Sequence, residues 1–406
     1  MERRVVITGL GIWSCLGTSL DEVRQSLYSG KSGIIFSQAR KDAGFRSALC
    51  ADVPKADLKE YLSRDLRKLM PEEAQYGYLA TIQAMEHAKL DQDFLDQNEV
   101  GVIYGNDSVA EATMTALDKF RQAGSTAACG SGAIFQSMNS TVTMNLATLL
   151  HLRGINLTAS AACASGSHSV GLSYLLIKDG LQDCIICGGA QEANMFSVAS
   201  FDGLMAFSTR EDEPTKASRP FDKDRDGLIP GGGAATLVLE SYEHAVKRGA
   251  PILAEIVGWG FSGNGDHIST PNVAGPTRSL ELCLKNGGIN PRDIGYINAH
   301  ATSTHAGDGR EALAIANIFG DYRVPVTSTK SQTGHEMWMA GASELIYSIL
   351  MMKNDFIGGS LNFENPDEDT ACINVIPETR EAHFDMFLSN SFGFGGTNSS
   401  LIIKNL

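Results

Sequence analysis

The sequence contains no hydrophobic run that could cross a bilayer. Its longest apolar stretch, residues 345–352, includes Tyr347 and Ser348 and falls far short of the roughly 20 apolar residues that a membrane-spanning helix needs. The N-terminus also lacks the apolar region of a secretory signal, because only the apolar triplet 5–7 separates the charged start from Thr8 and Gly9. We therefore expect no membrane anchor and no signal peptide.

The sequence also lacks an excess of positive charge. Its 33 lysine and arginine residues face 47 aspartate and glutamate residues, which gives a formal net charge of -14 at pH 7. A field of this sign repels phosphates, so it argues against nucleic acids and anionic membranes as general partners. A local basic patch could still bind an acidic protein.

Cysteine spacing typical of disulfides or metal sites is missing as well. The eight cysteines are scattered along 406 residues, and a chain of this length does not need disulfides to stabilise its core, so we expect a reducing cytoplasm. Cys184 and Cys187 form a C-x-x-C pair, but no second pair and no histidine at zinc spacing accompanies them. The acidic loop 221–227 lacks the glutamate that a calcium loop requires. We predict no metal and no cofactor.

Apolar strands alternate with amphipathic helices along the chain, a pattern typical of an α/β fold. The pattern restarts after residue 250, and the length exceeds one ordinary core, so we predict two similar halves, residues 1–250 and 251–406. Segment 125–140, rich in small residues and poor in charge, is expected to be a loop at an active site or a subunit interface. The expected strands are residues 5–7, 100–105, 155–158, 183–189, 235–240, 252–257, 294–298 and 324–328, and the expected helices are 19–29, 72–90, 278–286, 309–318 and 341–352.

Cys163 lies where a predicted strand turns into a predicted helix. Small residues surround it in segment 161–166, which would let a substrate approach the sulfur closely. The helix that follows, ending before Asp179, would direct unpaired N–H groups and its positive dipole at the thiol, so we expect a lowered pKa and a reactive thiolate. A buried structural cysteine is the alternative interpretation.

Three segments that follow predicted strands in the second half carry reactive groups. His300 and His335 stand among glycines and small hydroxyl residues, and Lys330 lies five residues before His335. Together with Cys163, two imidazoles suit either base-assisted nucleophilic attack or stabilisation of a developing oxyanion. Glycines beside Phe394 would allow backbone N–H groups to face a reacting carbonyl.

These motifs occur in an order that resembles the β-ketoacyl-acyl carrier protein synthases, the condensing enzymes of the thiolase superfamily. The resemblance extends over essentially the whole chain, and the length together with the glycine run 231–233 is more similar to the type I bacterial elongating enzymes than to type II. It implies a five-layered αβαβα thiolase-like fold made of two similar halves, and a homodimer. The matching segments are residues 6–11, 161–164, 216–222, 225–227, 300–304, 330–335 and 390–398.

The resemblance also implies a role for each site residue. Cys163 would be the acylated nucleophile, and His300 and His335 would hold the malonyl thioester during a decarboxylative Claisen condensation, with Lys330 supporting them. The amides of Cys163 and Phe394 would form the oxyanion hole, and the Phe394 ring would act as a gate. The supporting residues would be Glu311, as the buried acid associated with Lys330, and the motif residues Thr302, Thr304 and Phe392.

The implied partner is an acyl carrier protein, which brings both the acyl and the malonyl group. Arg64, Arg67 and Lys68 form a basic cluster that would dock this carrier, although Asp65 partly neutralises it. A charged cluster on a surface is often simply solvated, which is the alternative interpretation.

Two segments depart from the family pattern. Residues 336–339 include Trp338 where the family has small glycines and alanines, and residues 106–111 replace a glycine-rich segment. We expect Trp338 to reshape the acyl pocket, since packed interiors respond to single methylenes. The expected function is a 3-oxoacyl-[acyl-carrier-protein] synthase of fatty acid elongation. One alternative is a ketosynthase of a specialised polyene or polyketide pathway, paired with a chain-length factor, and another is a non-catalytic partner subunit, which the retained Cys163 and both histidines oppose.

Overall fold

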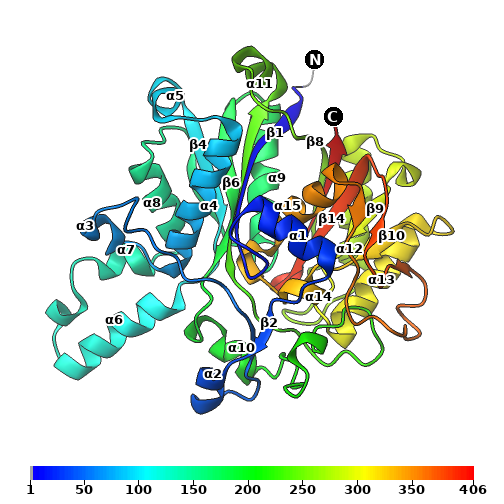
Figure 1. Ribbon diagram of the computed structural model, residues 1–406, viewed down its shortest axis with the longest axis horizontal. Coiled ribbons are helices and arrows are strands. Elements are labelled where there is room, and N and C mark those ends of the chain that lie inside the picture. Colours follow the sequence, from blue (N-terminus) through cyan, green and yellow to red (C-terminus); the bar gives the residue numbers. More distant parts are fainter. Residues whose placement is uncertain (1–2) are drawn as a thin grey trace.

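The computed structural model describes residues 3–406, so the first two residues of the predicted first half lie outside the described residues. Eleven strands of this part of the chain form one mixed sheet in the order β12-β10-β9-β14-β15-β8-β1-β7-β6-β4-β5 (Figure 1). The strands are β1 Val5–Trp13, β2 Ile34–Phe36, β3 Leu49–Ala51, β4 Val100–Gly105, β5 Asn156–Ala159, β6 Cys184–Gln191, β7 Gly233–Ser241, β8 Ala254–Gly263, β9 Tyr296–Asn298, β10 Pro325–Thr327, β11 Phe356–Ile357, β12 Asn374–Val375, β13 Arg380–Glu381, β14 Met386–Gly393 and β15 Thr397–Asn405.

The α-helices cover the outer faces of this sheet, and two of them lie between its two groups of strands. They are α1 Leu20–Ser29, α2 Gln38–Asp42, α3 Arg64–Arg67, α4 Glu72–Ala88, α5 Gln92–Gln97, α6 Ala110–Ala123, α7 Ala133–Ser137, α8 Thr141–Leu149, α9 Ser165–Lys178, α10 Ala199–Gly203, α11 Tyr242–Arg248, α12 Ala274–Gly287, α13 His305–Phe319, α14 Lys330–Thr333 and α15 Ala340–Lys353. None of the helices within residues 3–406 is both long and apolar enough to cross a membrane.

The strand topology of the first half recurs in the second. In the order β5-β4-β6-β7-β1, the first three strands are parallel to one another, and each of the last two is antiparallel to the strand before it. The order β10-β9-β14-β15-β8 has the same directions. The two groups join where residues 5–7 of β1 pair with residues 254–256 of β8. We propose the boundary between the halves after residue 250, in the connection that precedes β8.

The helices complete five layers around these two groups of strands. Helices α9 and α15 lie between the groups, α4 and α8 cover the outer face of the first group, and α12 covers that of the second with α13 beside it (Figure 1). This arrangement confirms the predicted thiolase-like αβαβα fold. The turn that carries Cys163 leads directly into the central helix α9.

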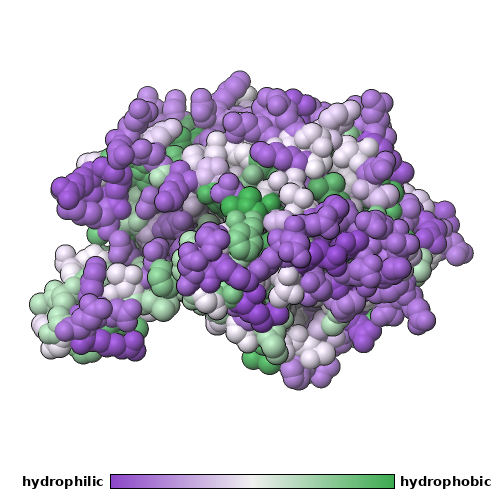
Figure 2. Space-filling view, turned by 60° about the horizontal axis from the view of Figure 1, so that its bottom comes forward, coloured by the Kyte–Doolittle hydropathy of each residue, from purple (hydrophilic) through white to green (hydrophobic). Residues whose placement is uncertain are grey.

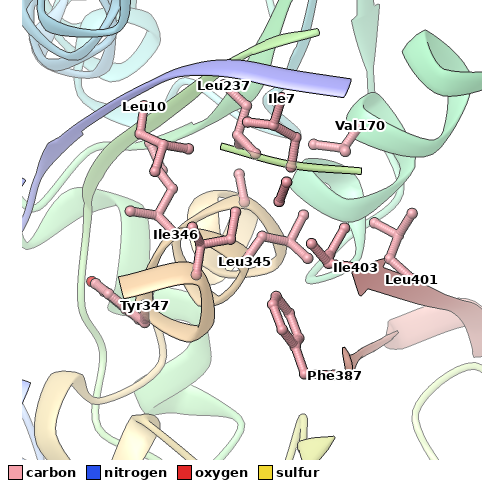
Figure 3. Close-up of a cluster of buried hydrophobic side chains, with 14 of the residues drawn as sticks. Ile7, Leu10, Val170, Leu237, Leu345, Ile346, Tyr347, Phe387, Leu401 and Ile403 are labelled. Carbon is pink, nitrogen blue, oxygen red and sulfur yellow. The ribbon is translucent and has the colours of Figure 1, made fainter. Parts of the chain in front are cut away.

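The central layer is held by apolar side chains from both halves. Helix α15 is buried on nearly all sides, as expected for a helix that is apolar around its whole circumference. Its residues Leu345 and Ile346 lie among Ile7 of β1, Leu237 of β7 and Phe387 of β14 (Figure 3). Because both halves contribute to one core, we expect them to unfold together.

Close packing explains the glycines of the first motif. A Cβ atom on Gly9 or Gly11 of β1 would collide with the carbonyl oxygens of Ala84 and Ala80 in α4. Only glycine allows the helix backbone to approach the strand so closely. This contact seats α4 on the first group of strands.

Most predicted elements are confirmed to within a few residues. Strand β4 has the predicted limits, and Ser19 caps α1 by accepting a hydrogen bond from the amide of Glu22 at 3.3 Å. The prediction of a loop over residues 125–140 is wrong, because this segment contains a helical turn at Thr126–Cys129 and helix α7. It packs beside α6 in an arm that projects from the body (Figure 1) and does not line the cavity at Cys163.

Candidate active site

Cys163 occupies a tight turn between β5 and α9. The turn places Ala162 in the left-handed region with φ of 46°, which costs a non-glycine residue conformational energy. The Ser165 hydroxyl holds this conformation by accepting a hydrogen bond from the Ala161 amide at 2.8 Å and donating one to the Ala162 carbonyl at 2.6 Å. The Cys163 side chain is buried, with 6% of the residue exposed, and it reaches a cavity of about 310 Å³.

The predicted lowering of the Cys163 pKa is wrong. Burial raises the pKa of this thiol to about 12, against smaller opposing effects of the Lys330 ammonium and of the backbone amides of Phe394 and Cys163. Desolvation disfavours the charged thiolate, and here it outweighs the positive groups around the sulfur. The resting cysteine is therefore a thiol at neutral pH, and a nucleophilic role would require it to lose its proton.

Parallel pairing brings the reactive residues of the second half together. Strand β9 pairs with β10 through Asn298 and Thr327, and with β14 through Asn298 and Ser389. The carboxyl ends of these strands meet at one edge of the sheet, where α/β proteins place their sites. The residues that follow each strand, His300 among them, therefore reach a common cavity.

His300 and His335 line the same cavity as Cys163, with ring centroids 5.3 Å apart and planes at 85°. Burial lowers the pKa of both rings well below 6.5, and the Lys330 charge lowers it further. Within residues 3–406, Nδ1 of His300 and both ring nitrogens of His335 have no hydrogen-bond partner. The site therefore presents two neutral imidazoles to whatever enters.

These neutral rings predict a loss of stability in acid. Below about pH 6.5 the unfolded chain protonates both histidines while the folded rings stay neutral, so the free energy of unfolding falls as the pH drops. The expected slope is up to about 1.4 kcal/mol per pH unit for each ring. Urea denaturation between about pH 7 and pH 5 measures the free energy of unfolding. This free energy should fall less steeply with decreasing pH in the double variant His300→Gln/His335→Gln than in the wild-type chain.

The exposed His383 provides the control for this measurement. It bonds to Asp355 at 2.7 Å and its pKa is raised, so His383→Gln should not reduce the loss of stability in acid. Equal slopes for the wild-type chain and the double variant would contradict the neutrality of His300 and His335.

Lys330 is buried and forms an ion pair with Glu344 of α15. Glu311, predicted as the buried acid associated with Lys330, is buried and interacts with the Lys330 charge, although the direct ion pair of Lys330 is with Glu344. Glu311 accepts hydrogen bonds from the amides of His300 at 2.9 Å and Ala301 at 2.7 Å, and from Asn390 Nδ2 at 3.0 Å. Burial raises the pKa of Glu311 to about 7, and the Lys330 charge is only a minor opposing effect. Glu311 therefore holds the backbone of the His300 loop.

Glu344 is a residue that sequence reasoning missed. It is the one acidic residue in the otherwise apolar helix α15, and a carboxylate in such a helix needs a cationic partner when it is buried. That pattern could have identified it. Burial raises the pKa of Glu344 to about 7, while the Lys330 charge opposes this.

Phe394 begins a turn at Phe394–Gly396 in which Gly395 and Gly396 have φ of 76° and 73°. Its backbone amide lies against the sulfur of Cys163. Its ring is 39% exposed and stacks on Phe201 at 6.0 Å, with the planes 17° apart. The backbone amide and the ring of Phe394 thus both lie at the cavity of Cys163, and Phe201, which the sequence did not indicate, packs against that ring.

The remaining supporting residues also lie at the cavity. The ring of Phe392 packs against His300 at 6.0 Å. The hydroxyls of Thr302 and Thr304 are 3.1 Å apart in its wall, and their amides donate to Asp308. These hydroxyls give this part of the cavity wall hydrogen-bonding groups.

The basic cluster predicted for carrier docking lies apart from the cavity. Arg64 and Arg67 belong to α3, Lys68 follows it, and Lys68 is paired with Asp65 at 3.1 Å. The three cations border a shallow depression to which Lys55 and Lys59 also contribute. These two lysines were not predicted, because they are separated from the cluster in the sequence.

Comparison with known proteins gives matches over the whole chain. The family model described as "Beta-ketoacyl synthase, N-terminal domain" matches residues 2–245, and "Beta-ketoacyl synthase, C-terminal domain" matches residues 253–364. The 3-oxoacyl-[acyl-carrier-protein] synthase 1 of Haemophilus influenzae is 41% identical over 99% of both chains.

Solved structures agree with these matches. A beta-ketoacyl synthase from Burkholderia phymatum superposes with a TM-score of 0.96 at 37% identity, covering all of both chains. A type II PKS ketosynthase, solved in complex with its acyl-carrier protein, gives 0.90 at 28% identity, again over all of both chains.

Proposed function

The chain belongs to the β-ketoacyl synthase family, and we propose that it acts as a 3-oxoacyl-[acyl-carrier-protein] synthase in fatty acid chain elongation. It is a condensing enzyme of the acyltransferase type. One observation carries the proposal: a buried cysteine, two neutral histidines and two backbone amides share one cavity.

In the first step, the Cys163 sulfur attacks the acyl thioester of the carrier protein. The S–acyl bond forms, the bond to the carrier sulfur breaks, and the thiol proton ends on the departing carrier thiol. Because the resting group is a thiol, a neutral imidazole of the site takes up this proton in transit. The amides of Cys163 and Phe394 stabilise the oxyanion that forms on the acyl carbonyl.

In the second step, malonyl carrier protein occupies the same cavity and loses CO₂. The electron pair of the broken carbon–carbon bond moves toward the thioester carbonyl and forms an enolate. The rings of His300 and His335 donate hydrogen bonds to the enolate oxygen. The carbanion then attacks the acyl–Cys163 carbonyl. The new carbon–carbon bond gives a β-ketoacyl carrier, and the released sulfur regains a proton.

Intact mass spectrometry tests this function directly. The purified chain is incubated first with an acyl carrier protein and then with malonyl carrier protein. The expected result is an acyl adduct on Cys163, followed by its loss and the appearance of a β-ketoacyl carrier. Absence of an adduct with every acyl group, short or long, would overturn the proposal and favour a non-catalytic subunit.

The two alternative functions have less support. A non-catalytic partner subunit does not need Cys163, His300 and His335 in one cavity. Relatives that are 36–41% identical over the full length carry names of 3-oxoacyl-[acyl-carrier-protein] synthases 1 and 2, which favours fatty acid elongation over a specialised polyene or polyketide pathway.

We propose that an acyl carrier protein docks on the basic surface of Arg64, Arg67, Lys68, Lys55 and Lys59. Cations around one depression suit an acidic partner, and such rim charges mainly accelerate encounter. The Arg64→Glu variant should therefore raise the KM for carrier by about tenfold at low salt, equivalent to about 1.4 kcal/mol.

Steady-state kinetics with malonyl and acyl carrier protein measure this effect. The difference should shrink at high salt, because exposed charges are screened. Lys285→Glu, on the outer helix α12, is the matched charge-reversal control. An equal change in KM for both variants would mean that the cluster is merely solvated.

We propose that two copies of this chain form a homodimer in the cytoplasm. Strand β5 is an edge of the large sheet, and its Leu157 is 43% exposed; an unprotected edge is suited to pairing with another chain. The projecting arm of α6 and α7 also exposes apolar side chains (Figure 2): Met114, Leu117, Phe120, Ile134 and Phe135. All eight cysteines are free, which fits a reducing compartment. Native mass spectrometry distinguishes the homodimer from a heterodimer with a chain-length factor.

A further inference from the structure

Trp338 belongs to the same buried apolar cluster as Cys163. It belongs to the short helical turn Met337–Met339 between His335 and α15, and only 7% of it is exposed. Met337 is also part of this cluster. The other side chains of this cluster are Val198, Phe207 and Leu228, with Phe45, Ala162, Phe201 and Ala206 packed against them.

The backbone of Trp338 has no room to withdraw from this position. Its carbonyl oxygen lies 2.9 Å and 2.6 Å from the points where Cβ atoms on Gly166 and Gly189 would stand. Helix α9 and strand β6 therefore enclose it closely. The preceding residue, Met337, is held in the left-handed region with φ of 48°, which fixes the direction in which the next side chain points.

The indole ring is fixed as well. Its Nε1 donates a hydrogen bond to the Ser108 hydroxyl at 3.3 Å, and Phe201 packs against it with ring centroids 6.4 Å apart. Phe201 also stacks on Phe394, the ring at the mouth of the cavity. A continuous row of aromatic rings thus runs from the entrance to Trp338.

The cavity that reaches the sulfur is bounded on this side by Phe201, and Trp338 packs behind that ring. Among the described residues, its lining includes Cys163, Phe201 and Leu228 but neither Trp338 nor Ser108. An acyl group on the sulfur directs its carbonyl oxygen to the amides of Cys163 and Phe394, so its alkyl chain must extend into the apolar cluster. Trp338 fills that space.

We propose that Trp338 closes the acyl end of the site and restricts the enzyme to short acyl groups. This inference rests on the proposed synthase function and specifies its substrate class. Truncating a buried aromatic ring leaves a cavity of the size that binds benzene, about 150 Å³, which would accommodate several methylene groups. Trp338 is therefore a specificity residue rather than a catalytic one.

The test compares acylation of Cys163 by butanoyl and dodecanoyl carrier protein, measured by intact mass spectrometry over time. The wild-type chain should react with butanoyl carrier at least about 100-fold faster, because one or more buried methylenes without space cost several times 1.4 kcal/mol. Trp338→Ala should raise the relative rate with dodecanoyl carrier at least about tenfold.

Two further variants separate bulk from hydrogen bonding. Trp338→Phe retains a large ring without the N–H group, and Ser108→Ala removes the acceptor while keeping the indole. Both should retain the preference for short chains if bulk is the cause. A change in Ser108→Ala equal to that in Trp338→Ala would overturn the steric explanation.

The outcomes also distinguish this inference from the function on which it rests. Equal wild-type rates with butanoyl and dodecanoyl carrier, or an unchanged ratio in a folded Trp338→Ala variant, would overturn the inference and leave the synthase function intact. No acylation by either carrier would reject both. If Trp338→Ala does not fold, Trp338→Leu gives the same comparison. Equal wild-type rates with the two carriers would overturn the inference without any variant.

Discussion

Replacement of Cys163 by alanine is expected to abolish acyl transfer and condensation, with a loss of at least about 10⁴-fold in rate. Without the sulfur, no acyl–enzyme bond can form, and the remaining groups cannot substitute for it because no second thiol lines the cavity among the described residues. The malonyl site should survive, since His300, His335 and the Phe394 amide do not depend on the sulfur for their positions.

The measurement combines intact mass spectrometry with an assay of CO₂ release from malonyl carrier protein. Cys163→Ala should show no acyl adduct but should still decarboxylate malonyl carrier. Cys129→Ala is the matched control, because Cys129 lies on the projecting arm away from the cavity and its loss should change neither result. Condensation by Cys163→Ala at the wild-type rate would show that the nucleophile is assigned wrongly.

Replacement of His335 by alanine is expected to slow decarboxylation by about 10²- to 10³-fold, the usual cost of removing one oxyanion donor. Neither nitrogen of this ring has a hydrogen-bond partner among residues 3–406, and the ring is neutral, so it can donate to an enolate oxygen. Acylation of Cys163 should persist, because the backbone amides of Cys163 and Phe394 hold the oxyanion of that step and His300 remains to take up the thiol proton.

His168→Ala is the matched control for a buried histidine. His168 bonds to the Thr397 hydroxyl at 2.9 Å and does not line the cavity, so its loss should leave the ratio of acylation to decarboxylation unchanged. His335→Asn should keep part of the decarboxylation rate through its amide donor. If His335→Ala lost acylation and decarboxylation to the same extent, the division of roles between the two steps would be refuted.

Local sequence patterns predicted the elements well, because the physical signals are local. A continuous apolar run gave the limits of the buried strand β4, and the serine cap before α1 marked the start of that helix. Patterning failed for segment 125–140, where small residues suggested a loop and the chain instead forms α7 and a helical turn. There, packing against α6 outweighs the low helix preference of the residues.

The sequence also indicated which reactive residues line the cavity. His300, His335 and Phe394 come after the neighbouring strands β9, β10 and β14, whose parallel pairing brings their carboxyl ends to one edge. Cys163 follows β5 in the other group of strands, and it joins these residues at the cavity through the packing of the two halves. Their catalytic roles stay predictions until the variants are measured. The apolar helix around Glu344 indicates that this carboxylate needs a cationic partner, but only the tertiary structure shows that Lys330, rather than another cation, is that partner.

The sequence by itself therefore determined the alternating α/β elements, the turn that carries Cys163 and the family to which the chain belongs, since these depend on residue order and short-range geometry. Only the tertiary structure decided the ion pair of Lys330 with Glu344, the raised pKa of Cys163 and the position of Trp338 in the apolar cluster of Cys163. Each of these depends on burial and on contacts between distant segments, and desolvation in a packed interior can reverse what a helix terminus alone would favour.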